Sequence, residues 1–268
     1  MLENYLNIEF LNKICKIAVN AGKAVMDIYK EDFKVDEKMP NHPITKADLN
    51  SHFIIQDSLK DLIPDTFFLS EESENIDWET RKNWKKYWLV DPLDGTKEFI
   101  NKNGEFTVNI ALIEESKPVL GVVFAPAFSK IYFASKGVGC FLSHININES
   151  SISLEPKKLS INNYSSNQKT LKIISSRSHK NNNKMESWLK LQNQYELKYS
   201  GSSIKFCLIA EGEADIYPRF RPTCEWDTAA GHSILKEAGG NVKDLNGMEI
   251  LYNKKDSIIN PEFIASRF

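Results

Sequence analysis

The segment WLVDPLDGTKEF, residues 88–99, constrains the fold more than any other part of the chain. The apolar run Trp88–Val90 has the character of the end of a buried strand, and Asp91 and Asp94 follow it directly. Like charges at such close spacing repel each other and raise each other's pKa. We therefore expect a positively charged species to lie between the two carboxylates.

The composition is that of a globular protein without nucleic-acid-binding character. A length of 268 residues permits one large domain or two small ones, and a hydrophobic share of 41% is enough for a sizeable core. The formal net charge of −2 offers no basic field for nucleic acid. The four cysteines form no CxxC pair, so we expect small buried thiols in a reducing compartment and no zinc site.

The apolar segments are short. None approaches the roughly 20 apolar residues that span a bilayer, and the first residues lack the basic start and apolar run of a signal peptide. We therefore expect a cytoplasmic protein with no transmembrane segment. Peripheral attachment to the cytoplasmic face of the inner membrane is left open, and so is the oligomeric state, with a homodimer among the alternatives.

The first half of the chain predicts two helices followed by a sheet. Apolar residues recur at helical spacing over 8–29, and a second helix is predicted over about 46–62, with Thr45 as N-cap and Asp48 three residues on. Strand patterns bounded by turn signals then occupy 66–72, 87–91, 106–114, 118–126 and 130–137. These strands are consistent with one mostly antiparallel sheet.

The second half alternates strands with helices, which favours an α/β layering. Strands are predicted over 171–178, 195–203 and 214–220, and helices over 184–192, 204–214 and 225–240. Residues 143–170 are polar without a clear period, which predicts a surface connection. We therefore predict a single domain over 1–268, with subdomains of about 1–142 and 171–268 on either side of this connection.

Acidic residues recur at the edges of other buried elements. Glu71 and Glu72 follow an apolar run, and Asp227 begins a helix rich in small residues. Alone, Glu71 is an ordinary surface acid after a strand, and Asp227 alone is a favourable charge at a helix N-terminus. Together these acids form an oxygen-only set of the kind that binds Mg²⁺, with Mn²⁺ as a substitute. The spacing does not fit an EF-hand, and no P-loop pattern is present.

The DGT triplet adds an anion-binding feature. Gly95 permits a close approach of the backbone to a ligand, and the amides of Gly95 and Thr96 would point at an anion if a helix or turn begins there. Divalent ions beside such amides make a phosphate site, where the ions activate a water molecule and neutralise developing charge. The sequence thus predicts a phosphate-hydrolysing enzyme, with Mg²⁺ as the species between Asp91 and Asp94.

Three motifs resemble those of a known superfamily. The sequences EES at 71–73, DPLDGTKEF at 91–99 and WDTAAG at 226–231 are similar to the signatures of the lithium-sensitive, Mg²⁺-dependent phosphatases that include inositol monophosphatases. The resemblance extends over roughly residues 10–262, and the motifs occur in the family's order. It implies a layered αβαβα sandwich that acts as a single catalytic domain.

The resemblance also implies roles for individual residues. Two or more Mg²⁺ ions would be held by four side chains and one backbone carbonyl: Glu71, Asp91, Asp94, Asp227 and the carbonyl of Leu93. Thr96, hydrogen-bonded to Asp48, would help Glu71 orient the attacking water. Asp94, Gly95, Thr96 and Asp227 would also contact the substrate. A T-x-x-D helix cap accounts for Asp48 equally well without catalysis.

The second half narrows the expected substrate. The stretches at 175–179, 201–220 and 226–232 resemble 3′(2′),5′-bisphosphate nucleotidases of the bacterial sulfur-assimilation type. This resemblance implies nucleotide contacts from His179, Ser202, Lys205 and Arg219. A second phosphate needs a cation away from the metals, which Lys205 or Arg219 supplies, whereas inositol-monophosphatase-like members are expected to carry an acid near position 219.

The expected activity is Mg²⁺-dependent hydrolysis of adenosine 3′,5′-bisphosphate to AMP and phosphate by a metal-activated water. The sulfated form of the nucleotide is a second expected substrate, and lithium inhibition is implied by the resemblance. The alternative within the superfamily is an inositol monophosphatase or related sugar phosphatase. A sensor that binds Mg²⁺ and nucleotide without turnover is the alternative from another class.

Overall fold

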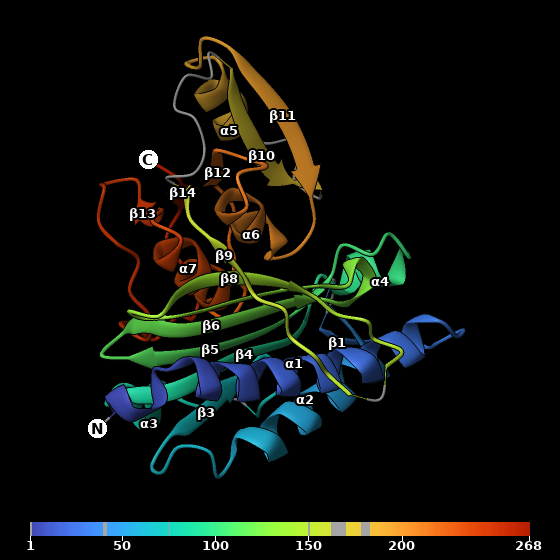
Figure 1. The fold of residues 1–268 in the computed structure, drawn as a ribbon. Coiled ribbons are helices and arrows are strands. Elements are labelled where there is room, and N and C mark those ends of the chain that lie inside the picture. The colour runs from blue at the N-terminus through green and yellow to red at the C-terminus, as the bar shows by residue number, and fades with distance from the viewer. Residues whose placement is uncertain (1, 40–41, 75, 150, 162–169, 178–182) are drawn as a thin grey trace.

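The fold is a stack of alternating helical and sheet layers, as Figure 1 shows. A computed structural model describes the chain except residues 1, 40–41, 75, 150, 162–169 and 178–182. Helices α1 (Ile8–Tyr29) and α2 (Lys46–Leu59) pack on a seven-stranded sheet, and α7 (Ala229–Glu237) packs against the same sheet from the side of the five-stranded one. Helix α6 (Ile204–Ala210) packs against α7, and α5 (Asn183–Leu189) lies beside β10 and β11 (Figure 1). The expected layered sandwich is confirmed.

The larger sheet is mostly antiparallel, as predicted. Its spatial order is the chain order: β3 (Phe67–Ser70), β4 (Lys86–Asp94), β5 (Thr107–Glu114), β6 (Lys117–Ala125), β7 (Lys130–Ser135), β8 (Gly139–His144) and β9 (Lys157–Leu159). Only β3 and β4 pair in parallel among these seven strands. Their parallel pairing brings the carboxyl ends of both strands to one edge of the sheet.

The segment 143–170, expected to be a surface connection, contains one strand of the sheet. Strand β9 pairs with β8 at the sheet edge, and the subdomain boundary expected near residue 142 falls inside β8. The sequence pattern hides β9 because it consists of two lysines and one leucine, and charged residues are common on edge strands. The division into two subdomains stays a prediction.

The smaller sheet mixes parallel and antiparallel pairs. Its spatial order is β11 (Tyr195–Ser200), β10 (Leu171–Ser176), β12 (Ile216–Arg219), β14 (Phe263–Ser266) and β13 (Asn241–Asp244). The first three strands are parallel neighbours, and the last two pair in antiparallel fashion. Strands β13 and β14 were not predicted, because each has four residues and depends on pairing with the rest of the sheet.

Several short elements connect the layers. They are η1 (Leu2–Tyr5), β1 (Val35–Met39), β2 (His42–Thr45), α3 (Trp78–Arg81), α4 (Thr96–Ile100) and η2 (Pro126–Phe128). Strands β1 and β2 form a separate antiparallel pair. Among the residues that the structure describes, no helix is long and apolar enough to cross a membrane.

Helix α1 has the predicted bounds, whereas the other four predicted helices are shorter than predicted. Helix α5 ends at Leu189 and not at residue 192. Helix α2 stops at Leu59, and α6 ends at Ala210 before Gly212 takes a left-handed conformation with φ of 83°. Helix α7 starts at Ala229 and not at residue 225, because residues 224–228 form turns in which the Asp227 carboxylate accepts a hydrogen bond from the Cys224 amide. The expectation that Asp227 begins the helix is therefore wrong by two residues.

Each face of the larger sheet carries its own hydrophobic core. One core lies under α1 and α2, and the other lies between the two sheets. Gly121 on β6 allows α7 to approach the sheet closely, since a Cβ atom there would lie 2.4 Å from the carbonyl oxygen of Ala230. This approach fixes the start of α7, and with it the turn that carries Asp227.

We expect Gly121→Ala to destabilise the protein by about 3 kcal/mol, because the added methyl group meets helix backbone that cannot move without disturbing the core. Urea unfolding measures the change. The matched control is Gly137→Ala, where a Cβ meets nothing within 4 Å and only the positive φ of 78° costs about 1 kcal/mol. Equal effects of the two substitutions would contradict the close helix–sheet contact.

Candidate active site

Three carboxylates from distant parts of the chain converge at the edge of the larger sheet. Glu71 follows β3, Asp91 lies on the neighbouring parallel strand β4, and Asp227 lies in the turn before α7. Each of them offers an oxygen within 4.8 Å of the other two. The structure therefore brings together three of the four side chains that the resemblance implied as metal ligands.

A bulge in β4 turns both of its aspartates toward this edge. Residues three apart on a regular strand point to opposite faces. Between Asp91, which faces Asn109, and Asp94, which faces Thr107, the pairing with β5 shifts by one residue. As a result Asp91 and Asp94 both line one hollow, together with the backbone of Leu93 between them.

Asp91 is a buried carboxylate surrounded by other negative charges. It is buried, one oxygen accepts a 3.0 Å hydrogen bond from the Leu93 amide, and its Oδ2 has no hydrogen-bond partner among the described residues. Burial, followed by the charges of Glu71, Asp94 and Asp227, raises its pKa well above the usual range. An orphaned carboxylate oxygen in an oxygen-only cluster fits a hard divalent cation.

Asp227 is held in place from its own turn. Its Oδ2 accepts hydrogen bonds from the Thr223 hydroxyl at 2.5 Å and from the Cys224 amide at 2.9 Å. Burial, followed by the charge of Asp94, raises its pKa to about 6. The side chain does not cap α7, whose N-cap is Thr228. A helix cap therefore does not account for Asp227.

Asp94 lies beside the three-carboxylate set and faces the opposite wall. Its Oδ2 accepts a 2.5 Å hydrogen bond from the Ser203 amide and a longer one, 3.5 Å, from the Asn109 side chain. Burial raises its pKa, and the charge of Lys205 opposes that effect. Asp94 therefore connects the acidic cluster to the loop before α6.

Thr96 and Asp48 make the contact that the resemblance implied. The Thr96 hydroxyl donates to Asp48 Oδ1 at 3.3 Å and lies 3.4 Å from the Leu93 carbonyl oxygen. The other oxygen of Asp48 accepts from the Thr45 amide and hydroxyl, both at 2.7 Å, and completes a capping box on α2. The cap and the contact with Thr96 thus use different oxygens of one buried carboxylate.

Gly95 holds the turn between β4 and α4 in a left-handed conformation with φ of 90°. A Cβ atom there would lie 3.0 Å from the Glu105 carbonyl oxygen, so the turn has no room for a side chain. Helix α4 has five residues and begins at Thr96, which meets the condition that a helix or turn starts there. The contact of these amides with an anion stays a prediction.

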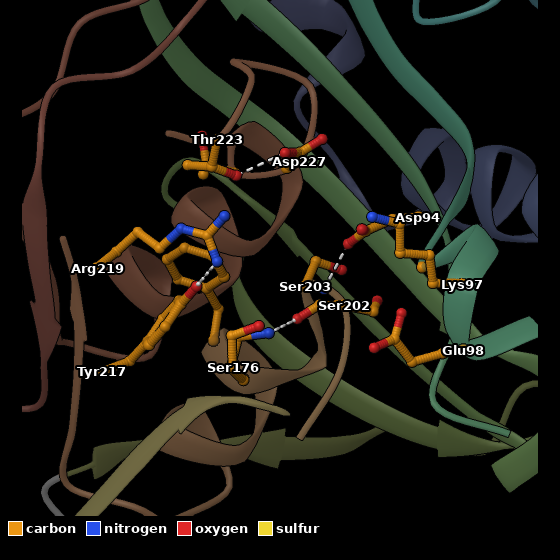
Figure 2. A pocket seen from close by; sticks show the side chains of 14 residues that line it. Asp94, Lys97, Glu98, Ser176, Ser202, Ser203, Tyr217, Arg219, Thr223 and Asp227 are labelled. Carbon is orange, nitrogen blue, oxygen red and sulfur yellow. Dashed lines mark hydrogen bonds between the residues drawn. The ribbon is translucent and has the colours of Figure 1, made fainter. Parts of the chain in front are cut away.

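Two adjoining hollows share a wall at this site. One, of about 330 Å³, contains the carboxylates Glu71, Asp91, Asp94 and Asp227. The other, of about 190 Å³, contains Ser202, Lys205 and Arg219 (Figure 2). Both are lined by Asp94, Gly95, Lys97, Glu98, Thr223 and Asp227. An acidic hollow thus opens beside one that contains cations.

The cations of the second hollow are held by neighbouring groups. Lys205 is only 3% exposed, its Nζ donates to the Ser202 carbonyl, and it lies 5.1 Å from the ring centre of Tyr217. Arg219 donates to the carbonyls of Arg221 at 3.0 Å and Pro222 at 2.7 Å. Lys205 is therefore a buried residue of this hollow and not an exposed surface lysine. His179, also expected here, lies outside the described residues.

The model of the inositol monophosphatase family matches residues 7–267. The chain belongs to this family. It is 42% identical to the 3′(2′),5′-bisphosphate nucleotidase CysQ of Escherichia coli over 263 residues, which is 96% of this chain and 99% of that protein. The CysQ nucleotidase of Buchnera aphidicola is also 42% identical, over 96% of this chain and 94% of its own length.

A solved family structure shows the same fold. CysQ from Bacteroides thetaiotaomicron, described as a bacterial member of the inositol monophosphatase family, is 38% identical to this chain. The two superpose with a TM-score of 0.83, over 98% of this chain and all of that one. Membership of the inositol monophosphatase family therefore holds for both sequence and fold.

Some residues of the site were not singled out in the sequence. Lys97 and Glu98 lie inside the family motif at 91–99 and could have been found there. Ser176, Tyr217 and Thr223 line the second hollow but belong to no motif with a chemical signature. Their positions depend on how the second sheet meets the turn before α7.

Proposed function

We propose that the protein is a Mg²⁺-dependent phosphomonoesterase that converts adenosine 3′,5′-bisphosphate to AMP and phosphate. The relatives named as 3′(2′),5′-bisphosphate nucleotidases match nearly the whole chain. The observation that carries the proposal is the pairing of two hollows, one acidic and one containing Lys205 and Arg219. A substrate with two phosphates has one for each hollow.

The proposed metal ligands are Glu71, Asp91, Asp94, Asp227 and the carbonyl of Leu93, holding two or more Mg²⁺ ions, for which Mn²⁺ can substitute. Bound Mg²⁺ would lower the pKa of a water molecule and neutralise charge on the phosphoryl group. The inositol monophosphatase family implies this metal dependence, and the oxygen-only donor set agrees with it. Lithium inhibition is part of the same proposal.

Thr96, Asp48 and Glu71 are proposed to orient the attacking water. Because the Thr96 hydroxyl donates its proton to Asp48, its oxygen can accept a hydrogen bond from water. A carboxylate oxygen of Glu71 accepts a hydrogen bond from the other O–H group of the same water molecule. Two acceptors aim the lone pair of the oxygen at phosphorus, which lowers the entropic part of the barrier. The phosphate that is removed is proposed to contact Asp94, Gly95, Thr96 and Asp227.

The second phosphate or the nucleoside is proposed to bind to four residues, Lys205, Arg219, Ser202 and His179. An arginine at position 219, beside a buried lysine, favours a dianion over a sugar hydroxyl. The chain is proposed to act as one catalytic domain. Cytoplasmic location, a homodimer and use of the sulfated nucleotide stay predictions.

A substrate panel tests the proposal. Phosphate release is measured from adenosine 3′,5′-bisphosphate, its sulfated form and inositol 1-phosphate, with Mg²⁺ and with a chelator. We expect Mg²⁺-dependent release with the bisphosphate preferred. Preference for inositol 1-phosphate would assign the alternative activity, and tight binding of the bisphosphate without release in a single turnover would make the protein a sensor.

We also expect Mg²⁺ to stabilise the fold more at neutral than at acidic pH. A carboxyl whose folded pKa is raised contributes stability at low pH that is lost as the pH rises through that pKa, and Asp227 has a pKa of about 6. Near pH 5.5 Mg²⁺ must displace the proton bound to the Asp227 carboxylate, whereas near pH 7.5 that carboxylate is already ionised. Calorimetry should show a rise in Tm of roughly 5–10 °C at about pH 7.5 and a smaller rise at about pH 5.5. Equal shifts would contradict binding to the acidic cluster.

A further inference from the structure

Glu98 is a buried carboxylate on the wall that the two hollows share. It lies on the short helix α4, is only 8% exposed, and lines both hollows. Figure 2 shows its carboxylate turned away from α4 toward Ser202 on the facing loop. A charge in this position faces the space that a bound molecule would occupy.

The surroundings of Glu98 are fitted to it. A Cβ atom on Gly201 would lie 2.6 Å from the Glu98 Cγ, so the stem of Glu98 packs against a position where only glycine leaves room. The Gly201 amide donates to Glu105 Oε2 at 2.8 Å, and Glu105 pairs with Arg177, whose Nε donates to Oε2 at 3.0 Å. The loop that faces Glu98 is thereby held from behind.

A carboxylate here does not bind a phosphate directly. Asp94 and Asp227 line the same wall, and a third negative charge beside a phosphate would weaken its binding. The phosphates of the proposed substrate therefore lie toward the divalent ions and toward Lys205 and Arg219. The groups of the substrate that suit a contact with Glu98 are therefore its neutral hydrogen-bond donors.

A bisphosphorylated adenosine carries two kinds of neutral donor, the free ribose hydroxyl and the amino group of the base. The hydroxyl is attached to the carbon next to the one that carries the reacting phosphate, whereas the base lies further away. Glu98 lines the hollow of the metal-binding carboxylates as well as the hollow of the cations. This position places it next to the reacting phosphate and favours the hydroxyl.

We propose that Glu98 binds the ribose hydroxyl vicinal to the phosphate that is removed, and so selects ribonucleotides over 2′-deoxyribonucleotides. The inference rests on the proposed function and names a specificity-determining residue of that site. A hydroxyl that donates to a carboxylate makes a charge-assisted hydrogen bond, which the 2′-deoxy analogue cannot make. With a 2′-phosphate as the reacting group, the 3′-hydroxyl takes the same place.

The test compares kcat/KM for adenosine 3′,5′-bisphosphate and its 2′-deoxy analogue. We expect the wild-type enzyme to prefer the ribonucleotide by about 10- to 100-fold. In Glu98→Met, which keeps the stem that packs against Gly201, the preference should fall to within about 3-fold, and Glu98→Gln should lie between. Glu213→Gln is the matched control, because this exposed carboxylate lines neither hollow; it should keep the wild-type preference.

Three outcomes would overturn the assignment. In the first, the wild-type enzyme does not distinguish the two nucleotides. In the second, Glu98→Met loses activity on both nucleotides equally. In the third, Glu98→Met alters only the preference between adenosine and inosine 3′,5′-bisphosphates. The last would assign Glu98 to the base. Failure of the proposed function is separate, because it appears as no Mg²⁺-dependent release from the ribonucleotide by the wild-type enzyme.

Discussion

Asp91→Asn should lower kcat by about 1,000-fold or more, while the metal-free protein remains at least as stable as the wild type. The loss is expected because a divalent ion contributes several kcal/mol of transition-state stabilisation and Asp91 is the most buried of its proposed carboxylate ligands. The fold survives because the amide oxygen of asparagine can still accept from the Leu93 amide. Removing one of several crowded buried charges also relieves their repulsion.

Phosphate release and thermal unfolding in the presence of a chelator measure these two effects. Asp57→Asn on the exposed face of α2 is the matched control, and it should change neither. The rise in Tm caused by Mg²⁺ should be lost in Asp91→Asn and kept in the control. Wild-type turnover by purified Asp91→Asn would remove the metal assignment.

Arg219→Glu should lower kcat/KM for the bisphosphate nucleotide by about 100-fold and leave hydrolysis of inositol 1-phosphate unchanged or faster. The substitution replaces a cation that lines the second hollow with an anion, and so turns attraction for the second phosphate into repulsion. A substrate with one phosphate does not meet this charge. The ratio of the two kcat/KM values is therefore the informative quantity.

Arg221→Glu makes the same change of charge two residues away, at an exposed side chain that lines neither of the two hollows. It should reduce activity on the nucleotide only slightly. If both arginine variants have the same small effect, Arg219 acts through the general field of the protein, and the second phosphate must bind elsewhere.

Much of the fold follows from patterns in the sequence. The periodicity over α1 and the apolar runs of β4 to β7 are strong local signals, and the structure places these elements close to the predicted bounds. Strands β9, β13 and β14 have three or four residues each, and their formation depends on neighbouring strands. Local sequence therefore carries little information about them.

The candidate site likewise has residues that the sequence predicts and residues whose positions depend on distant parts of the chain. The acidic set and the motifs predicted that Glu71 and Asp91 converge. The structure explains how, because β3 and β4 are adjacent parallel strands whose carboxyl ends meet at one edge of the sheet. The pattern around Asp227 predicts helix, whereas the structure forms a turn there, in which the Asp227 carboxylate accepts hydrogen bonds from Thr223 and Cys224. The position of Glu98 could not be predicted, since it depends on the approach of Gly201, about one hundred residues away in the chain.

The measurement that tests the central claim most directly is an anomalous difference map from crystals grown with Mn²⁺. The account predicts anomalous peaks bounded by the carboxylates of Glu71, Asp91 and Asp227, with one more near Asp94 when phosphate is present. Crystals that show ordered carboxylates and no peak among them at saturating Mn²⁺ would contradict the claim that these acids bind the ions of a phosphatase.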